Sequence, residues 1–297
     1  MRPLAPLLLL SLAGCRATGT PAAPACATVR DGDMAWIPSG AVTLGEDGRY
    51  PEEGRPRRID LPGFWLSTHE VTVGEFARFV AATGYRTVAE RAPPVTPETS
   101  ADMRRPGSAV FATPDDADPR WWRWRTGAQW RRPEAWAPAP AAEPVVQIAY
   151  ADARAYARWR GMALPSEAQW ERAARTGGVD VEHTPPEHPP VANVWQGPFP
   201  ARDLAGDGYA GRAPVGCFPR DRAGLYDMIG NVWEWTRDTD ASGVRGVIKG
   251  GSYLCAANYC ARYRPAARQF QERGLGTDHI GFRVVDPRRP PPPGARP

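Results

Sequence analysis

The stretch from residue 90 to residue 144 shows little helical or strand periodicity and is rich in proline, arginine and tryptophan. Irregular segments of this length are usually either functional loops or disordered. Disorder is disfavoured because large apolar side chains need burial, and five tryptophans lie here: Trp121, Trp122, Trp124, Trp130 and Trp136. The chain also contains 34 prolines and 30 glycines among its 297 residues. We therefore expect few long helices and much ordered loop.

Regular elements are predicted on either side of this stretch. Residues 31–45 predict a strand, a turn and a second strand. Three helices are predicted from capping and stop signals: one that follows the capping box Thr72-Val-Gly-Glu75 and ends near Gly84, one over 151–160, and one that starts at Ser166 with Gln169 and stops at 177–178. This pattern predicts an α+β fold, a single compact domain over residues 27–286 with low regular secondary structure.

The two ends of the chain have a different composition from the domain. Arg2, the apolar run of residues 4–12 and the ending Leu12-Ala13-Gly14-Cys15 are typical of a secretory signal, and the ending resembles a bacterial lipobox. We expect a signal peptide over 1–14, a lipidated Cys15 that anchors the chain to a membrane, and a flexible tether over 15–26. The protein would then be exported, facing the periplasm or the cell exterior. The alternative is an ordinary signal peptide with a chance cysteine.

The residues after the domain, 287–297, are rich in proline and arginine and are predicted to be disordered. The formal net charge of the chain is +4, and the basic residues are spread along it rather than clustered. A nucleic-acid surface needs basic residues gathered on one face, so we expect no nucleic-acid partner. We expect the protein to be a monomer.

Two cysteines lie within the run GGSYLCAANYCARYR, at Cys255 and Cys260. Their spacing does not fit a thioredoxin-type motif, and no second pair completes a zinc site. A local disulfide, two buried thiols or a Cu(I) site all remain open, because two thiolates suit a soft ion of low coordination number. Nearby arginines would favour the thiolate form, and they are Arg262, Arg264 and Arg268. Cys26 and Cys217 are candidates for a further disulfide in an oxidising compartment.

Two other segments combine carboxylates, an amide and turn-forming glycines. They are Asn193-Val-Trp-Gln-Gly with Asp207-Gly-Tyr209 downstream, and the run from Asp227 to Trp235. Such oxygen-rich segments suit Ca²⁺, which accepts backbone carbonyls as well as carboxylates. Neither segment is an EF-hand, so from spacing alone we favour the simpler explanation that these side chains cap turns.

Several segments appear together in an order that resembles a known family. They are GDMAWIPSG, HEVTVGEFARFV, WRRPEAWAP, LPSEAQWERAARTGG, NVWQGPFP, GLYDMIGNVWEWTRD and KGGSYLCAANYCARYRPAAR followed by GFRVV. Together they resemble the formylglycine-generating enzyme, or sulfatase-modifying factor, family over residues 34–285. The Cys-x4-Cys spacing within this context is the most specific signal.

The resemblance implies a C-type-lectin-like fold and an oxidase that uses O₂. It implies that the enzyme converts the cysteine of a Cys-x-Pro-x-Arg segment in an unfolded sulfatase polypeptide into formylglycine. Cys255 and Cys260 would hold Cu(I), with Ser252 beside them in the catalytic site. The residues implied to bind substrate are Tyr259, Trp233, Arg262 and His279.

The resemblance also implies two structural Ca²⁺ sites. The first set is Asn193, Val194, Asp207 and Tyr209; the second is Asp227, Gly230, Val232 and Glu234. His279 stands where the best-known members have an asparagine near the substrate. It is open to three roles, as a third copper ligand, an acid or base, or a hydrogen-bonding residue of the rim, and we favour the rim.

Two other functions compete with this one. A non-catalytic calcium-stabilised cell-surface binding module of the same superfamily predicts a stable Cys255–Cys260 disulfide. A non-haem iron oxidase needs a histidine-rich ligand triad. The chain has only four histidines, none paired at helical ligand spacing, namely His69, His183, His188 and His279.

Overall fold

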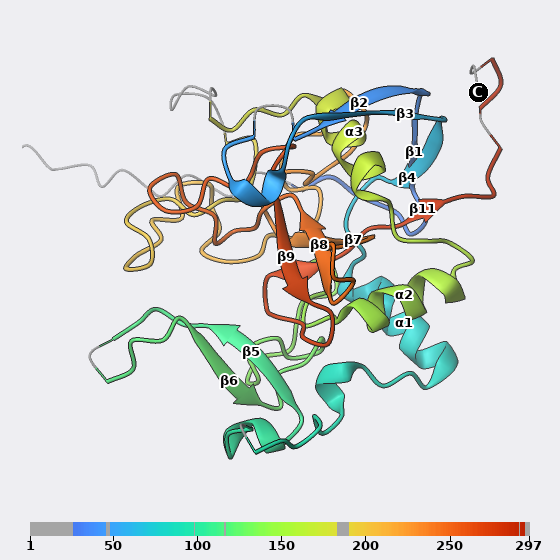
Figure 1. Ribbon diagram of the computed structural model, residues 1–297. Coiled ribbons are helices and arrows are strands. Elements are labelled where there is room, and N and C mark those ends of the chain that lie inside the picture. The colour runs from blue at the N-terminus through green and yellow to red at the C-terminus, as the bar shows by residue number, and fades with distance from the viewer. Residues whose placement is uncertain are drawn as a thin grey trace, which may run out of the picture.

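The computed structural model describes residues 26–45, 48–97, 99–115, 117–182, 190–290 and 292–294 (Figure 1). The predicted signal peptide, Cys15 and most of the predicted tether lie outside these residues. No helix in the described ranges is long and apolar enough to cross a membrane.

Short strands form four small sheets that surround a mixed core. The strands are β1 (Met34–Ile37), β2 (Gly40–Leu44), β3 (Arg57–Leu61), β4 (Phe64–Ser67), β5 (Gly107–Phe111), β6 (Trp122–Thr126), β7 (Trp233–Thr239), β8 (Arg245–Lys249), β9 (Arg268–Glu272), β10 (Ile280–Gly281) and β11 (Val285–Asp286). The largest sheet has the order β10-β7-β8-β9, and another has the order β1-β4-β11. β2 pairs with β3, and β5 pairs with β6. The two strands predicted in residues 31–45 are therefore confirmed, although each pairs with a later strand.

The helices are α1 (Val73–Thr83), α2 (Tyr150–Trp159) and α3 (Glu167–Gly177), with one-turn 3-10 helices η1 (Pro51–Glu53), η2 (Val88–Glu90) and η3 (Asp102–Arg104). Both predicted capping boxes are confirmed. At the start of α1, the Glu75 amide donates to Thr72 Oγ1 at 3.1 Å and the Thr72 amide donates to Glu75 Oε2 at 2.8 Å. The predicted stops at Gly84 and Gly178 are confirmed, because both adopt the left-handed conformation that ends a helix.

The core joins α1 and α2 to the largest sheet through aromatic side chains. Phe76 of α1 contacts Trp130, Tyr156 and Phe282, with ring centroids 5.2, 5.9 and 6.5 Å away. Trp235 of β7 is fully buried, and its indole N–H donates to the carbonyl of Ile148 at 2.8 Å. Strands and helices occur in separate runs along the chain and the strand pairs are mostly antiparallel, which confirms the predicted α+β class in one domain.

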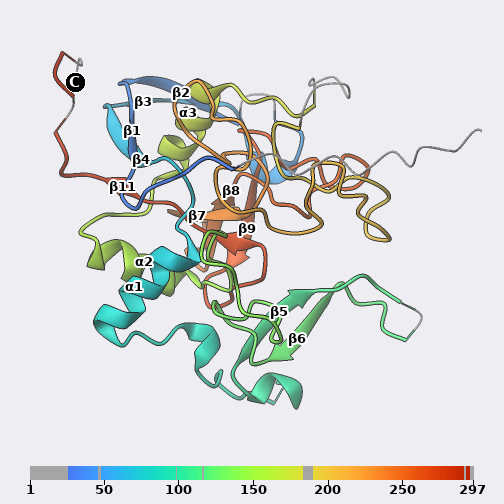
Figure 2. The ribbon, with the colours of Figure 1, turned by 180° about the vertical axis from the view of Figure 1, so that it is seen from behind.

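The prediction of little regular structure in residues 90–144 is wrong in one part. β5 and β6 form an antiparallel hairpin that projects from the body in both views (Figures 1 and 2). The five tryptophans are not buried to the same degree: Trp130 is 2% exposed, whereas Trp122 is 38% and Trp136 is 68% exposed. Tryptophans alternate with arginines along β6, which is the period-two pattern of a strand, but the burial of these side chains does not alternate.

The beginning of the domain is joined to a distant loop. Cys26 and Cys217 form a disulfide across 191 positions of sequence. The amide of Ala27 donates to the carbonyl of Gly216 at 2.8 Å, which holds the two segments side by side. The disulfide that the sequence left open is therefore present.

Candidate active site around two free thiols

The two cysteines lie in a loop that leaves β8 through two glycines. Gly250 and Gly251 have φ angles of +99° and +76°, which L side chains rarely adopt. A Cβ on Gly251 would lie 3.0 Å from the Cα of Tyr263, so glycine lets the start of the loop pack against its end. Ser252 is fully buried, and its carbonyl accepts the Cys255 amide at 2.9 Å.

Cys255 and Cys260 are free thiols that interact directly with each other. Cys255 is buried and Cys260 is partly exposed. The hydrogen bond with Cys255, and then the guanidinium of Arg262, lowers the pKa of Cys260 to about 6. The hydrogen bond with Cys260, together with burial, raises the pKa of Cys255 well above its usual range. Both effects favour a thiolate on Cys260 and a thiol on Cys255.

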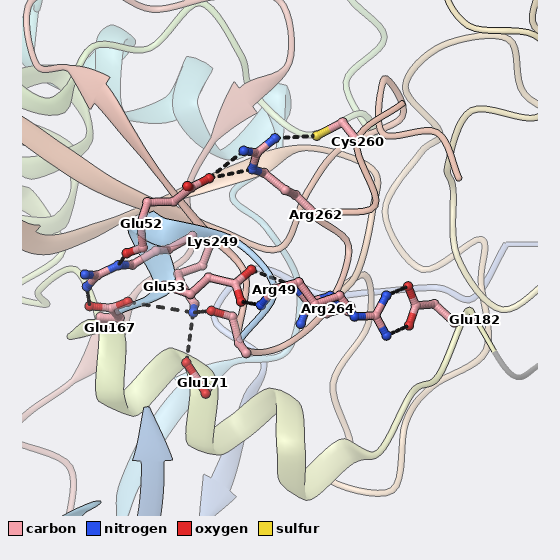
Figure 3. Close-up of polar contacts among 12 residues, drawn as sticks. Arg49, Glu52, Glu53, Glu167, Glu171, Glu182, Lys249, Cys260, Arg262 and Arg264 are labelled. Carbon is pink, nitrogen blue, oxygen red and sulfur yellow. Dashed lines mark hydrogen bonds and ion pairs between the residues drawn. The ribbon is translucent and has the colours of Figure 1, made fainter. Parts of the chain in front are cut away.

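Arg262 is held against Cys260 by a carboxylate from the other end of the domain. Its Nη1 donates to Cys260 Sγ at 3.2 Å, and its Nε and Nη2 donate to Glu52 Oε1 at 2.8 and 2.5 Å (Figure 3). The guanidinium also stacks over the ring of Tyr50 at 4.0 Å. Glu52 lies in η1, 210 positions from Arg262, and sequence reasoning missed it because no local pattern links them.

The other two arginines predicted to add positive potential have different partners. Arg264 pairs with Glu53 at 2.6 Å (Figure 3), and Arg268 pairs with Glu167 at 2.9 Å. Lys249 is fully buried and pairs with Glu171 at 2.9 Å. Carboxylates balance the positive charges of Arg264, Arg268 and Lys249, so these ion pairs mainly join η1 and α3 to the segments on either side of the thiols. Of the three arginines predicted to add positive potential, only Arg262 is shown in contact with a sulfur.

The pH dependence of alkylation tests this arrangement. In reduced, metal-free protein the rate at which iodoacetamide modifies Cys260 should rise with a midpoint near pH 6, because the thiolate is the nucleophile. Arg262→Gln should move the midpoint up by roughly one pH unit or more, since it removes the adjacent positive charge. Peptide mass spectrometry measures each rate separately. Arg120→Gln, in an exposed pair with Asp118, is the matched control. A wild-type midpoint above pH 8 would contradict the geometry.

Aromatic side chains form one side of the site. Tyr259 is 57% exposed; its ring stacks on Phe199 at 4.8 Å and meets Trp121 edge-on at 4.9 Å. Trp195 contacts Phe199 at 5.0 Å, and its amide donates to the Cys255 carbonyl at 3.1 Å. The predicted substrate residue Tyr259 is thus exposed beside the thiols, whereas Phe199 and Trp121 were not singled out from sequence.

His279 lies at the hairpin side of this aromatic surface. Its ring is 4.8 Å from that of Trp122, and its Nδ1 is 2.6 Å from Thr277 Oγ1. Burial lowers the pKa of His279 to about 3, so the ring is neutral at physiological pH. A neutral ring beside tryptophan suits hydrogen bonding rather than proton donation. Trp233, predicted to bind substrate, is 2% exposed and donates its amide to the His279 carbonyl at 2.8 Å.

Asp278 gives a second pH prediction. Burial raises its pKa to about 7, above the value of about 3.9 expected in the unfolded chain. Between these two pKa values the folded state holds a proton that the unfolded state has lost. The contribution of Asp278 to the free energy of unfolding is therefore complete below about pH 4 and is lost as the pH rises through 7. Between these limits the free energy of unfolding should fall by about 1.4 kcal/mol per pH unit from this group.

Asp278→Asn should remove that part of the slope. Urea unfolding at several pH values, for wild type and variant, measures the difference. Asp240→Asn is the control, because the pKa of that exposed-loop carboxyl is lowered to about 2 by Ser242 and Arg245. Equal slopes for wild type and Asp278→Asn would show that Asp278 is ionised throughout.

The first predicted calcium set is brought together. Asp207 accepts the Val194 amide at 3.3 Å and the Tyr209 amide at 3.0 Å, and burial raises its pKa to about 6. The Asn193 side-chain amide donates to the Gly211 carbonyl at 2.8 Å, which leaves its own oxygen available. Both Asp207 oxygens accept backbone amides, so a cation at this set would also need the Asn193 oxygen and the backbone carbonyls of Val194 and Tyr209.

The second set fits less completely. Asp227 Oδ1 is buried without a hydrogen-bond partner, as expected of an oxygen that faces a cation. Both Glu234 oxygens, however, accept from Arg283, at 2.7 and 2.8 Å, and one also accepts from Trp170. Across the described residues, no three His, Cys, Asp or Glu side chains are grouped so as to hold a metal by themselves. Either site would depend on backbone and amide oxygens.

Two thiols in contact, one of them a thiolate, form a donor set that fits Cu(I). The described histidines give no support to an iron site, because His69 contacts the carbonyls of Glu70 and Arg30, at 2.8 and 3.3 Å. His183 and His188 lie outside the described residues.

Comparison with known proteins places these features in a family. The family described as "Sulfatase-modifying factor enzyme 1-like domain" matches residues 20–288. Formylglycine-generating enzyme from Mycobacterium tuberculosis is 42% identical over 84% of this chain and 97% of its own length. Inactive C-alpha-formylglycine-generating enzyme 2 from Mus musculus is 34% identical over 86% of each chain.

A solved structure supports the fold. PvdO from Pseudomonas aeruginosa aligns with a TM-score of 0.61 at 24% identity, covering 85% of this chain and 93% of that one. The residues that match the family, 20–288, include the loop that carries Cys255 and Cys260.

Proposed function

Because the chain belongs to the sulfatase-modifying factor family, we propose that it is a formylglycine-generating enzyme. It oxidises the cysteine of a Cys-x-Pro-x-Arg segment in an unfolded sulfatase to formylglycine, using O₂ and Cu(I). The observation that carries the proposal is the contact between the free thiols of Cys255 and Cys260, with the guanidinium of Arg262 donating to the more exposed sulfur at 3.2 Å.

Cys255 and Cys260 would hold the metal, and bound Cu(I) supplies the one-electron chemistry that lets O₂ oxidise a C–H bond. Conversion of the substrate CH₂–SH group to an aldehyde releases sulfide and removes two electrons. Reduction of O₂ to water takes four, so a thiol reductant supplies the other two. Arg262 and Glu52 keep Cys260 in place, Ser252 supports the Cys255 amide, and the exposed Tyr259 ring offers an apolar surface to an extended, proline-containing peptide.

His279 is proposed to bind the substrate at the rim. Its neutral ring, fixed by Thr277 and Trp122, offers a hydrogen bond to the peptide. The lowered pKa of the ring argues against imidazolium as a proton donor, and the contacts with Thr277 and Trp122 place the ring beside the aromatic side of the site. The best-known members have an asparagine where this chain has His279. The peptide residue that His279 prefers is therefore proposed for this chain and is not implied by family membership.

The direct test is conversion of a synthetic Cys-x-Pro-x-Arg peptide by the reduced protein with Cu(I), a thiol reductant and air. Mass spectrometry detects the aldehyde, and a hydrazine probe confirms it. The same peptide with serine in place of cysteine is the control. Formation of aldehyde supports the proposal, whereas unchanged peptide at full copper loading contradicts it.

The alternative, a non-catalytic binding module, predicts a Cys255–Cys260 disulfide. Both cysteines are free thiols, which does not favour the binding module. One relative is nevertheless named as inactive. A thiol count on anaerobically purified protein separates the two functions. Two reactive thiols from Cys255 and Cys260 support the oxidase, and none supports the binding module.

We also propose that Ca²⁺ binds the two oxygen-rich sets and stabilises the fold. At a calcium concentration one hundred times the Kd, one site adds about 2.7 kcal/mol to the free energy of unfolding. EGTA should therefore lower the Tm by roughly 5–10 °C, and added Ca²⁺ but not Mg²⁺ should restore it. Asp207→Asn should reduce the response to EGTA. A Tm that EGTA leaves unchanged would contradict calcium binding.

Export and lipid anchoring remain part of the proposal. The Cys26–Cys217 disulfide supports an oxidising compartment. Metabolic labelling with a fatty acid analogue tests the lipid: wild type should be labelled and Cys15→Ala should not. Label on the variant, or none on wild type, would exclude lipidation at Cys15.

A further inference from the structure

A single tryptophan makes two different contacts with the segment that follows the domain. The indole Nε1 of Trp65 donates to the carbonyl of Pro290 at 2.7 Å. The guanidinium of Arg289 lies 4.0 Å from the centroid of the same ring. A directional hydrogen bond and a cation–π contact thus hold consecutive residues, 225 positions along the chain from Trp65.

The ring belongs to an aromatic pair on the outer surface of a small sheet. Trp36 of β1 lies directly opposite Trp65 of β4, with centroids 5.6 Å apart and planes tilted by 59°. Both side chains are only half-buried. Gly63 is part of the surface, because a Cβ there would lie 2.3 Å from the Trp36 ring. Exposed aromatic surfaces of this kind are the usual platforms for proline-containing segments.

The neighbouring arginine, Arg288, packs against a glycine rather than against Trp65. Arg288 lies against Gly161, where a Cβ would meet its Nη2 at 2.3 Å. Gly161 follows the C-terminal end of α2, whose carbonyls attract a cation. The carboxylate of Asp286 accepts the amides of Arg288 and Arg289, at 2.9 and 3.2 Å, which turns the chain toward the two sites. Each arginine therefore meets a different, specific partner.

We propose that the surface formed by Trp36, Gly63, Trp65 and Gly161, here called the Trp65 face, is a docking site for an arginine–proline segment. Its resident occupant is the chain's own segment from Pro287 to Pro290, which has no strand or helix of its own. The C-terminal segment runs beside β1 and β4, away from the β5–β6 hairpin (Figures 1 and 2). None of the contacts of this segment described above involves Cys255, Cys260 or Arg262, so docking is independent of the proposed oxidase function. Another polypeptide of this chemistry would have to displace the segment.

Limited proteolysis tests docking in the full chain. Trypsin cleaves after arginine unless proline follows, so within residues 287–297 only the bond between Arg288 and Arg289 is susceptible. Mass spectrometry of the released fragment 289–297 measures its cleavage. Trp65→Ala should accelerate release about tenfold, because it removes both contacts. Trp65→Phe keeps a ring and loses the donor, so about a fivefold increase is expected.

Trp136→Ala, which removes a fully separate exposed tryptophan, should release the fragment at the wild-type rate. If Trp65→Ala fails to fold, trypsin will cleave at many arginines, and the release of the fragment will not report on docking. Trp65→Phe then provides the test, because it keeps an aromatic ring at this position. Release from Trp65→Phe and Trp65→Ala at the wild-type rate would overturn the proposal.

Binding in trans tests the chemistry that the face recognises. A chain that ends at Asp286 keeps every strand and helix, and its far-UV spectrum is compared with wild type first. A fluorescent peptide of residues 286–297 should bind it saturably, measured by anisotropy. Replacing Arg289 by alanine in the peptide should weaken binding about two- to fivefold. No saturable binding, or equal binding of a lysine-rich peptide of the same charge, would overturn it.

Discussion

Replacement of Cys260 by serine is expected to abolish formylglycine formation while the protein stays folded. The rate should fall by roughly a thousandfold or more, which corresponds to about 4 kcal/mol of activation free energy. Serine keeps the size of the side chain, but a hydroxyl does not ionise near neutral pH and is a poor ligand for a soft metal. Cys260 carries the lowered pKa and receives the Arg262 hydrogen bond, so no neighbouring group replaces it.

The measurement is single-turnover conversion of the cysteine peptide, followed by mass spectrometry. Cys255→Ser should lose activity to the same degree, and the double variant should be no worse, because groups that act as one unit are not additive. The Tm of each variant should stay within a few degrees of wild type, since Cys260 is only partly buried. Full activity in either single variant would show that the pair is not the reacting centre.

Loss of the Glu234 carboxylate is expected to give a large change in stability. Arg283 and Glu234 are both fully buried and joined by two hydrogen bonds of 2.7 and 2.8 Å. Trp170 donates its indole N–H to the same carboxylate at 2.8 Å. Glu234→Ala would leave a guanidinium buried without its partner, and removal of one member of a buried pair costs about 3–5 kcal/mol. The Tm should drop by roughly 10 °C.

Thermal unfolding in EGTA measures this effect separately from calcium, because Glu234 also belongs to the second predicted calcium set. Arg120→Ala, which breaks an exposed pair with Asp118, is the control and should change stability by about 1 kcal/mol or less. A Glu234→Ala protein as stable as the control would mean that Arg283 is satisfied by the carbonyls of Ser67 and Tyr226 alone.

Local signals explain which parts of the fold were predictable. The capping boxes at Thr72 and Ser166 and the left-handed glycines at 84 and 178 lie within a few residues of the helix ends that they define. The β5–β6 hairpin was missed because its strands are only five residues long and ten residues separate them, although tryptophan and arginine alternate along β6. Its exposed rings contact His279 and Tyr259 rather than the core, which burial arguments do not anticipate.

The sequence predicts those site residues that lie close together along the chain. It does not predict partners that come from distant segments. Cys255, Cys260 and Arg262 come from one short run, and the structure places them in contact. Glu52 comes from η1 and reaches Arg262 only through folding. In the same way, the pairs of Glu53 and Glu167 with Arg264 and Arg268 show why the local charge near the thiols is smaller than the sequence suggests.

The central claim is that Cys255 and Cys260 together form a Cu(I) site, and a competition titration tests it most directly. Reduced protein and a colorimetric Cu(I) chelator are mixed under anaerobic conditions, for wild type and for the Cys255→Ser, Cys260→Ser double variant. Wild type should remove one equivalent of Cu(I) from the chelator, and the double variant should remove none. Equal copper binding by the two proteins would contradict it.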